Sequence, residues 1–386
     1  MQRKGNIIAR ENQVENLVSV GVDMGGALWA TAIHYWKSGK DCYFGFKDKK
    51  ERNKEERLYQ KISELINDGY KVQVYYEAGR YGYAPARIIK NLGAEVTILP
   101  INKLKVIMCG KIIKTDKLDA KFLGGLHPDD NLPSVYIPTN MEEGLRDAER
   151  ELTRLKKSIN RINAQIIAII ERTNLQTPKV HRTSQAWKRW VIEISNDIEF
   201  KQLSEFMVCR LKNMFEELEL FENHLAEWEA RIDKKQDKDR EQAREENIVM
   251  QEEQLAKYKG IGDVIARHFA WEIGDFSRFK NGKQFTSYFG MTPSPFASGT
   301  MNREQGISKS GRTSLRKMAI EMAWLWRRWQ PDSHLTKKWN SRLEQKGRAR
   351  KTAIVALARQ LLVALWRDVM YNESIEGAII NNAVKL

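Results

Sequence analysis

Four acidic residues in the first third of the chain have the types and spacing of a site for divalent metal ions. Asp23 follows the small and apolar run VSVGV, and Glu77 follows the run VQVYY. Asp116 and Asp119 are three residues apart, so they share one face of a helix. Carboxylate oxygens prefer Mg²⁺ or Mn²⁺ to zinc, and two such ions can assist in-line attack at phosphorus. The four acids therefore predict phosphodiester chemistry.

Each of these acids also has a simpler interpretation. A single aspartate or glutamate is most often a surface residue or a helix cap, and Lys114, Lys117 and Lys121 could neutralise the group in place of a metal. The joint pattern favours the metal site, because two acids end strands and two share a helix, in chain order. The prediction requires that the strands ending in Asp23 and Glu77 are neighbours in one sheet.

The segments around these acids predict such a sheet. Short runs rich in β-branched and aromatic residues indicate strands, and apolar residues at helical spacing indicate helices. Three consecutive strands followed by alternating helix and strand predict a mixed sheet of the ribonuclease H type, in an α/β domain over residues 1–138. The expected strands are residues 16–25, 28–36, 42–46, 71–79 and 95–100, and the expected helices are residues 49–69, 84–93 and 114–126.

A different pattern begins at Leu145 and predicts a coiled coil within residues 139–250. Apolar residues recur there every three or four positions, in two series separated by a joint that contains Pro178. The two helices could fold back on each other or pair across a dimer, and the sustained heptads favour an oligomeric role. The polar run 234–247 indicates a solvated helix or linker. The series are Leu145, Ala148, Leu152, Leu155, Ile159, Ile162, Ile166, Ile169 and Leu211, Met214, Leu218, Phe221, Leu225, Trp228, Ile232.

The last module, residues 251–386, is expected to be mostly α-helical and to bind nucleic acid. Its segment 278–351 contains 17 Lys or Arg residues and four acids, and so carries +13 of the net charge of +15. Binding of clustered cations to a polyanion is favourable because it releases the counterions of the polyanion. Gly260 and Gly262 have the spacing of a helix-hairpin-helix that receives a phosphate, although an ordinary glycine turn has the same pattern. The residues predicted to contact nucleic acid are Gly260, Gly262, Lys309, Arg312, Arg316 and Lys317.

Five tryptophans of this module are interleaved with basic residues. Such residues could serve as platforms for stacked bases, but a large apolar ring is more often buried in a core. Most of these tryptophans are therefore predicted to be core residues. They are Trp324, Trp326, Trp329, Trp339 and Trp366.

The overall composition excludes a disordered or membrane-spanning chain. Hydrophobic residues make up 42% of the sequence, yet no apolar run approaches the roughly 18 residues that a bilayer requires. The first residues lack the apolar stretch of a secretory signal. Cys42, Cys109 and Cys209 are odd in number and form no CxxC pair, so neither a disulfide framework nor a cysteine-based zinc site is supported. A reducing cytoplasm is the expected compartment.

Three motifs around the acids resemble the three blocks of the DEDD transposases. They are GVDMGG, YYEAG and KTDKLDA, and the N-terminal domain of that group is similar to the RuvC Holliday-junction resolvases. The chain from Val18 to Met370 resembles the insertion-sequence recombinases guided by a bridge RNA, and the segment Gly260–Ala323 resembles their C-terminal transposase domain. The resemblance implies that Mg²⁺ or Mn²⁺ is held by Asp23, Glu77, Asp116 and Asp119.

The resemblance also implies a covalent serine nucleophile in the C-terminal module. In that family the serine precedes a glycine, downstream of a Gly-x-x-Pro step, and GMTPSPFASG places Ser298 in this position. Ser294 is the rival, and Ala297 departs from the serine or other polar residue common at its place. From the residues alone, such a serine is usually a loop residue. The nearest histidines in sequence are His268 and His334, so a conventional Ser-His pair is not supported.

Three functions remain open on these grounds. The first is an RNA-guided recombinase, in which base pairing chooses the sequence and the protein reads backbone geometry. The second is a site-specific DNA invertase or junction-resolving nuclease that acts without RNA. The third, a non-catalytic nucleic-acid-binding scaffold, is disfavoured by the four acids. The first implies donor and target DNA, a noncoding bridge RNA and a homo-oligomer, dimer or tetramer, in a bacterial or archaeal cytoplasm and away from membranes.

Overall fold

The computed structural model describes residues 16–25, 29–45, 54–100, 115–173, 177–196, 203–233, 238–298 and 301–381. The chain divides into two compact units, Met1–Pro138 and Thr139–Leu386. No helix in the described ranges combines the length and the apolar character needed to cross a membrane.

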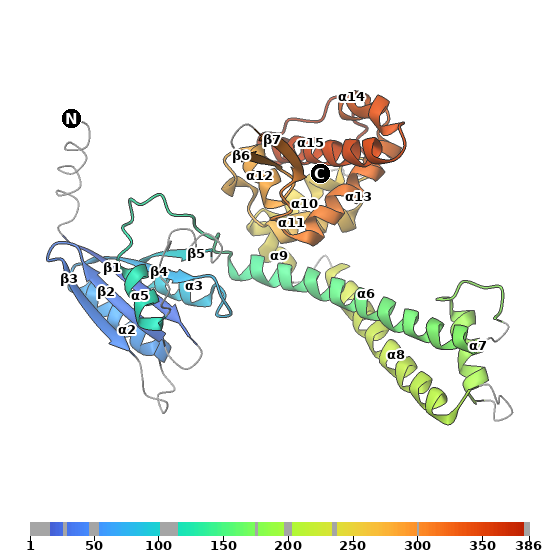
Figure 1. The fold of residues 1–386 in the computed structure, drawn as a ribbon, viewed down its shortest axis with the longest axis horizontal. Coiled ribbons are helices and arrows are strands. Elements are labelled where there is room, and N and C mark those ends of the chain that lie inside the picture. The colour runs from blue at the N-terminus through green and yellow to red at the C-terminus, as the bar shows by residue number, and fades with distance from the viewer. Residues whose placement is uncertain are drawn as a thin grey trace. The chain divides into compact units, whose positions relative to one another are not determined.

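The first unit contains the predicted mixed sheet. Its five strands have the order β3-β2-β1-β4-β5, with β1, β2 and β3 antiparallel and β4 and β5 parallel to β1. Parallel neighbours need a crossover connection, which helices provide here (Figure 1). The elements are β1 (Leu17–Met24), β2 (Trp29–Tyr35), β3 (Lys40–Gly45), α2 (Lys54–Asn67), β4 (Lys71–Glu77), α3 (Ala84–Asn91), β5 (Glu95–Leu99) and α5 (Asp116–Gly124).

Alternate residues of β1 belong to the two faces of the sheet. Val18, Val20 and Val22 are buried in one core together with Leu58 of α2 and Ile89 of α3. The period of two along a strand sends the intervening residues to the other face. The strand is therefore buried on both sides, as expected for the central strand of a sheet that helices cover on both faces.

Helix α5 covers the second face. The Ser19 hydroxyl donates to the carbonyl oxygen of Leu126 over 2.8 Å, just beyond the end of the helix. Gly21 lies so close to α5 that a Cβ atom built on it would come within 2.1 Å of the Gly124 amide nitrogen and 2.3 Å of the Ala120 carbonyl oxygen. Only hydrogen fits at Gly21, and this close approach fixes α5 against the middle of β1.

The second unit begins with a hairpin of long helices. Thr139 starts α6 with a capping box, in which its side chain accepts from the Glu142 amide while the Glu142 side chain binds the Thr139 amide. Ion pairs of Lys156 with Glu229 and of Arg161 with Glu217 show that α6 and α8 run antiparallel (Figure 1). The two predicted apolar series therefore pack on each other within one chain. The helices are α6 (Asn140–Arg172), α7 (Gln185–Asn196) and α8 (Glu205–Asp233).

The rest of the second unit is mostly helical, as predicted. Its core contains Phe269, Phe289, Trp326 and Leu361. The elements are α9 (Lys238–Glu245), α10 (Ile248–Ala256), α11 (Asp263–Ile273), η1 (Phe276–Arg278), α12 (Gly282–Tyr288), β6 (Pro293–Ser298), β7 (Met301–Ile307), α13 (Thr313–Trp329), α14 (His334–Leu343) and α15 (Arg348–Tyr371).

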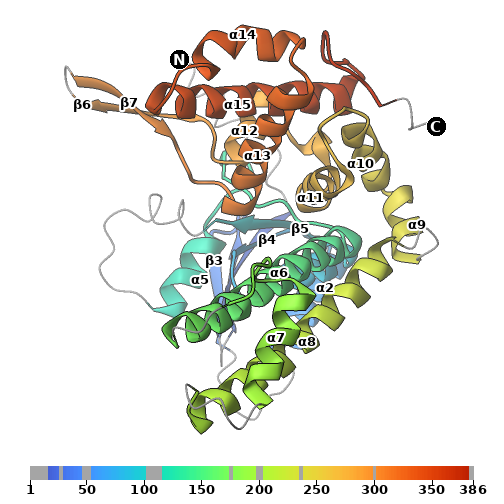
Figure 2. The ribbon, with the colours of Figure 1, turned by 90° about the vertical axis from the view of Figure 1, so that its right-hand side faces the viewer.

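The β6–β7 hairpin corrects the expectation that this region is helix and loop. Figure 2 shows the two strands extending from the helices of the unit. Among the described residues they pair only with each other, and their register shifts between Pro293 and Pro295. Proline and polar residues have low strand propensity, so the sequence gives little sign of a hairpin that cross-strand pairing stabilises.

The prediction that most of the five tryptophans are core residues is correct for some of them. Trp326 and Trp366 are 0% and 4% exposed, whereas Trp324 and Trp329 are 36% and 41% exposed. Trp339 is half-buried. Helical spacing places Trp324 and Trp326 on different sides of α13, which explains why neighbouring tryptophans have different environments.

Candidate functional site

The sheet places Asp23 and Glu77 beside each other. Strands β1 and β4 are parallel, and their pairing ends with Val22 opposite Tyr76, so the next residue on each strand is one of the two acids. Equivalent positions of parallel neighbours project to the same face, about 4.8 Å apart. Both residues are half-buried. Asp23 is two residues beyond Gly21, which places it on the face that α5 covers.

Helix α5 brings the other two acids to this face. Thr115 caps the helix by accepting from the Leu118 amide, and Asp116 and Asp119 lie in its first turn. Acidic residues are favoured there, because the exposed amide groups of a helix start carry partial positive charge. Asp119 is only 6% exposed, whereas Asp116 is exposed.

Tyr43 on β3 links the strand acids to the helix acids. Burial raises the pKa of its phenol, and the negative charges of Asp116 and Asp23 raise that pKa further. One side chain is thus within electrostatic reach of an acid from α5 and an acid from β1. The Lys117 ammonium lies 4.9 Å from the centre of the same ring, and Lys121 pairs with Asp41 over 3.2 Å. Both lysines have partners outside the four acids, and Lys114 is outside the described residues.

The four acids suit Mg²⁺ or Mn²⁺ by donor type. All donors are carboxylate oxygens, which these ions prefer. In the described part of the chain, no three His, Cys, Asp or Glu side chains are close enough together to hold an ion. Like charges repel at short range, so separation of the carboxylates is the expected arrangement without a cation. The sheet and α5 bring the four acids to one face.

The candidate nucleophile lies in the second unit. Ser298 ends β6 and pairs through its backbone with Met301, as the last pair of the regular ladder. Ser294 lies where the register shifts between Pro293 and Pro295. The expectation of a loop at Ser298 is therefore wrong for its backbone. The side chains of both serines fall outside the described part, so their roles stay predictions.

Two of the predicted nucleic-acid contacts organise the loop after β7. Arg316 donates from Nη1 to the carbonyl oxygens of Phe289, Lys309 and Gly311, at 3.4, 3.3 and 3.2 Å. Lys309 adopts φ of +56°, a strained conformation for a residue with a side chain. The Arg316 guanidinium thus stabilises a strained turn. The side chains of Lys309 and Lys317 are exposed.

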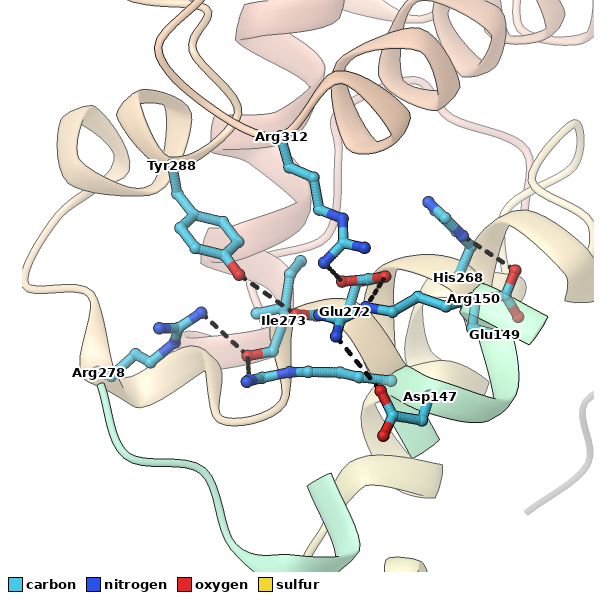
Figure 3. A network of polar contacts seen from close by, with 10 residues as sticks. Asp147, Glu149, Arg150, His268, Glu272, Ile273, Arg278, Tyr288 and Arg312 are labelled. Carbon is cyan, nitrogen blue, oxygen red and sulfur yellow. Dashed lines mark hydrogen bonds and ion pairs between the residues drawn. The ribbon is translucent and has the colours of Figure 1, made fainter. Parts of the chain in front are cut away.

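Arg312, a third predicted contact, is anchored to a buried acid (Figure 3). Its Nη1 lies 2.9 Å from Oε2 of Glu272, whose side chain is 2% exposed. Arg150 of α6 approaches the other oxygen of Glu272 over 3.4 Å. The hydroxyl of Tyr288 donates to the Glu272 carbonyl over 3.3 Å. Glu272 therefore connects the long hairpin, α11 and the start of α13.

Glu272 is not among the site residues predicted from the sequence. It stands within the apolar stretch FAWEIG, and a buried carboxylate requires charged or hydrogen-bonding partners. An acid inside an apolar helix is the feature of the sequence that indicates a buried, paired carboxylate. Its partners Arg150 and Arg312 are 122 and 40 positions away along the chain, so local sequence patterns do not identify them.

His268 is also part of this buried network. Its Nδ1 lies 2.9 Å from Oε1 of Glu149, and the Arg267 Nε lies 3.4 Å from Oε2 of the same residue. His268 is 3% exposed. The histidine nearest to the serines in sequence therefore joins α11 to α6.

Gly260 and Gly262 lie between α10 and α11, as predicted. Gly260 has φ of +92°, and a Cβ atom there would come within 3.0 Å of the Trp329 Cβ atom. Gly262 precedes α11 in extended conformation and is exposed. Asp263 follows in the first turn and competes with a phosphate for the helix start. The backbone of a helix hairpin is present, and nucleic-acid contact by these glycines stays a prediction.

Part of the second unit is similar to a known family. Residues 252–338 match the model of the "Transposase IS116/IS110/IS902 family". The chain is 43% identical over 128 residues to "Putative transposase y4rJ" of Sinorhizobium fredii, covering 33% of this chain and 32% of that protein. It is 22% identical over 371 residues to "Putative transposase y4qE" of the same organism, covering 90% and 87%.

A third relative has a name that indicates a different function. The chain is 30% identical over 126 residues to the "Pilin gene-inverting protein" of Moraxella bovis, covering 32% of this chain and 38% of that protein. The similarity thus spans about a third of the length of y4rJ and of the pilin gene-inverting protein, and most of y4qE.

Proposed function

We propose that this chain is a transposase of the IS116/IS110/IS902 family, a DNA strand-transfer enzyme that cleaves and rejoins DNA with an acidic metal centre and a serine. The observation that carries the proposal is the placement of Asp23 beside Glu77 on parallel strands, on the face that α5 covers. A DNA-binding scaffold without catalysis has no need to gather four acids in a protein of net charge +15. The transposase matches support the same reaction class.

The first unit is the metal-binding domain in this proposal. A mixed five-stranded sheet with strand-end acids supports a ribonuclease H-like fold of the RuvC type. Asp23, Glu77, Asp116 and Asp119 would hold Mg²⁺ or Mn²⁺, which when bound neutralises charge that develops on the scissile phosphate. Gly21 sets the distance of α5 from β1 and so positions both helix acids.

The second unit supplies the nucleophile in this proposal. Ser298 Oγ attacks the phosphorus, a new Oγ–P bond forms, and the bond to the leaving DNA oxygen breaks. The serine proton ends on that oxygen. A hydroxyl of the second strand then displaces the serine, which regains a proton. The helical hairpin, residues 139–250, is proposed to hold two or more copies together, and residues 251–386 to bind nucleic acid.

Guidance by a noncoding RNA is proposed on the sequence resemblance. The basic segment 278–351 carries +13 of the net charge, which supports a polyanionic partner in addition to the DNA. The similarity to the pilin gene-inverting protein supports the second candidate, a site-specific invertase without RNA.

Strand transfer on a circularised element distinguishes these two candidates. Purified full-length protein with Mg²⁺ and the noncoding RNA that flanks the element is expected to join donor to target DNA. Omission of the RNA is expected to reduce product to background, because base pairing then no longer selects the sites. Joined product is quantified by sequencing across the junctions. Equal product without RNA would favour the invertase.

Replacement of Ser298 by alanine tests the nucleophile. We expect loss of the covalent protein–DNA adduct that is trapped with nicked DNA, because the side chain that forms the Oγ–P bond is removed. Ser294→Ala is the matched control, on the same strand four residues away, and should keep the adduct. Denaturing electrophoresis of labelled DNA measures both. An adduct that survives in S298A and disappears in S294A would move the role to Ser294.

A further inference from the structure

A depression between α13 and α14 combines aromatic, cationic and amide groups. Its volume is about 490 Å³, and its walls come from two helices and the turn that joins them. Helix α13 contributes one aromatic and two basic residues, and α14 contributes a threonine and an asparagine. The lining residues are Trp324, Arg327, Arg328, Pro331, Thr336 and Asn340.

Trp324 remains accessible although its neighbour is buried. It is 36% exposed, whereas Trp326 is 0% exposed and donates from its indole nitrogen to Ser333 Oγ over 2.9 Å. The Arg350 guanidinium lies 5.0 Å from the centre of the Trp324 ring. This cation is attracted to the ring face and adds positive charge next to the depression. An accessible indole among cations is suited to a ligand that has both a flat ring and negative charge.

The surrounding charge is strongly positive. From Trp324 to Lys351 the sequence contains two acids, Asp332 and Glu344, and Asp332 pairs with Lys337 over 3.4 Å. The basic residues of the same segment are Arg327, Arg328, Lys337, Lys338, Arg342, Lys346, Arg348, Arg350 and Lys351. An apolar peptide would leave most of these charges without partners, whereas a phosphate-bearing strand would neutralise them.

The turn under the depression is held in place by buried hydrogen bonds. Ser333 caps α14 by accepting from the Thr336 amide. The side-chain amide of Gln330 donates to the carbonyl oxygens of Lys259 and Ile379, both at 2.8 Å, and Gln330 is 0% exposed. The two helices therefore keep a fixed spacing, which lowers the ordering cost of binding.

We propose that this depression binds an unpaired nucleotide of a single-stranded nucleic acid. The base stacks on Trp324, the Asn340 amide binds its hydrogen-bonding edge, and the flanking phosphates pair with Arg327 and Arg328. The base must be unpaired, because in a duplex both of its faces are covered by neighbours. The inference rests on the proposed function only in that the ligand is nucleic acid.

Fluorescence of 2-aminopurine tests the stacking. Full-length protein is titrated with short single strands, one of DNA and one of RNA, each with a single 2-aminopurine. Quenching is expected on binding, and Trp324→Ala should abolish it and raise Kd about tenfold for at least one strand, because base–aromatic stacking contributes on this scale. Trp324→Phe should restore part of the affinity. The strand that loses affinity in Trp324→Ala identifies RNA or DNA as the source of the nucleotide.

The matched control is Tyr371→Ala. Tyr371 ends α15 in the same unit, is 59% exposed, and does not line the depression, so both strands should bind this variant as they bind the wild type. A fully paired duplex should bind wild type and Trp324→Ala equally.

The proposal fails if both single strands keep their Kd and quenching in Trp324→Ala, or if Trp324→Ala weakens duplex binding as much as single-strand binding. Strand transfer is assayed on the same samples: stacking without strand transfer overturns the proposed function alone, and strand transfer without Trp324-dependent stacking overturns this site alone.

Discussion

Replacement of Asp23 by asparagine is expected to lower the rate of strand transfer by about 10²- to 10³-fold, the usual scale for loss of one group that stabilises transition-state charge. Asparagine has the same shape, so β1 and its pairing with β4 should persist. The asparagine lacks the negative charge that, in the proposed function, would attract a divalent cation to the sheet edge that Asp23 shares with Glu77. The rate is measured by single-turnover strand transfer, and Mn²⁺ binding by electron paramagnetic resonance should weaken in parallel.

Asp41→Asn is the control for this prediction. Asp41 is an acid of the neighbouring β3, but its interactions are with His34 at 2.6 Å and Lys121 at 3.2 Å. The hydrogen bond from His34 is the main reason that the pKa of Asp41 lies below its ordinary value. Its neutralisation should leave strand transfer within about twofold of the wild type, as expected for a surface ion pair. A D23N enzyme with normal strand transfer and normal Mn²⁺ binding would rule out the acidic centre.

Replacement of Gly21 by alanine should have the largest effect on stability. The added Cβ atom would meet three backbone atoms of α5, at 2.1, 2.3 and 2.6 Å. Backbone atoms cannot rotate away as a flexible side chain can, so α5 must separate from β1. Overpacking of this kind costs about 3 kcal/mol. The helix acids Asp116 and Asp119 move with α5, so Mn²⁺ binding should weaken as well.

Gly125→Ala provides the comparison at the end of the same helix. Gly125 has φ of −83°, and a Cβ atom there would meet its nearest neighbour at an ordinary 3.5 Å. The Tm from thermal unfolding should therefore stay near the wild-type value in Gly125→Ala and fall by several degrees in Gly21→Ala. An unchanged Tm and unchanged Mn²⁺ affinity in Gly21→Ala would show that α5 does not pack on β1 as described.

The local elements follow from the sequence because their signals are short-ranged. The strand runs before Asp23 and Glu77 are apolar and β-branched, the spacing of Asp116 and Asp119 is helical, and every helix and strand expected in residues 16–126 is present. The excess of positive charge in segment 278–351 can likewise be counted directly from the sequence. These features depend on residues within a few positions of each other, so a single sequence contains them.

Tertiary structure alone decides which of these elements meet. The register that sets Asp23 level with Glu77 joins strands 54 residues apart. The fold-back of α8 on α6 is one of the two pairings that the heptads leave open. Glu272 finds Arg150 and Arg312 from distant segments. Trp324 and Trp326 have the same residue type, and only their packing makes one a core residue and the other an accessible ring. The acids could be named from the sequence, but their assembly depends on long-range packing, which residue type and spacing do not encode locally.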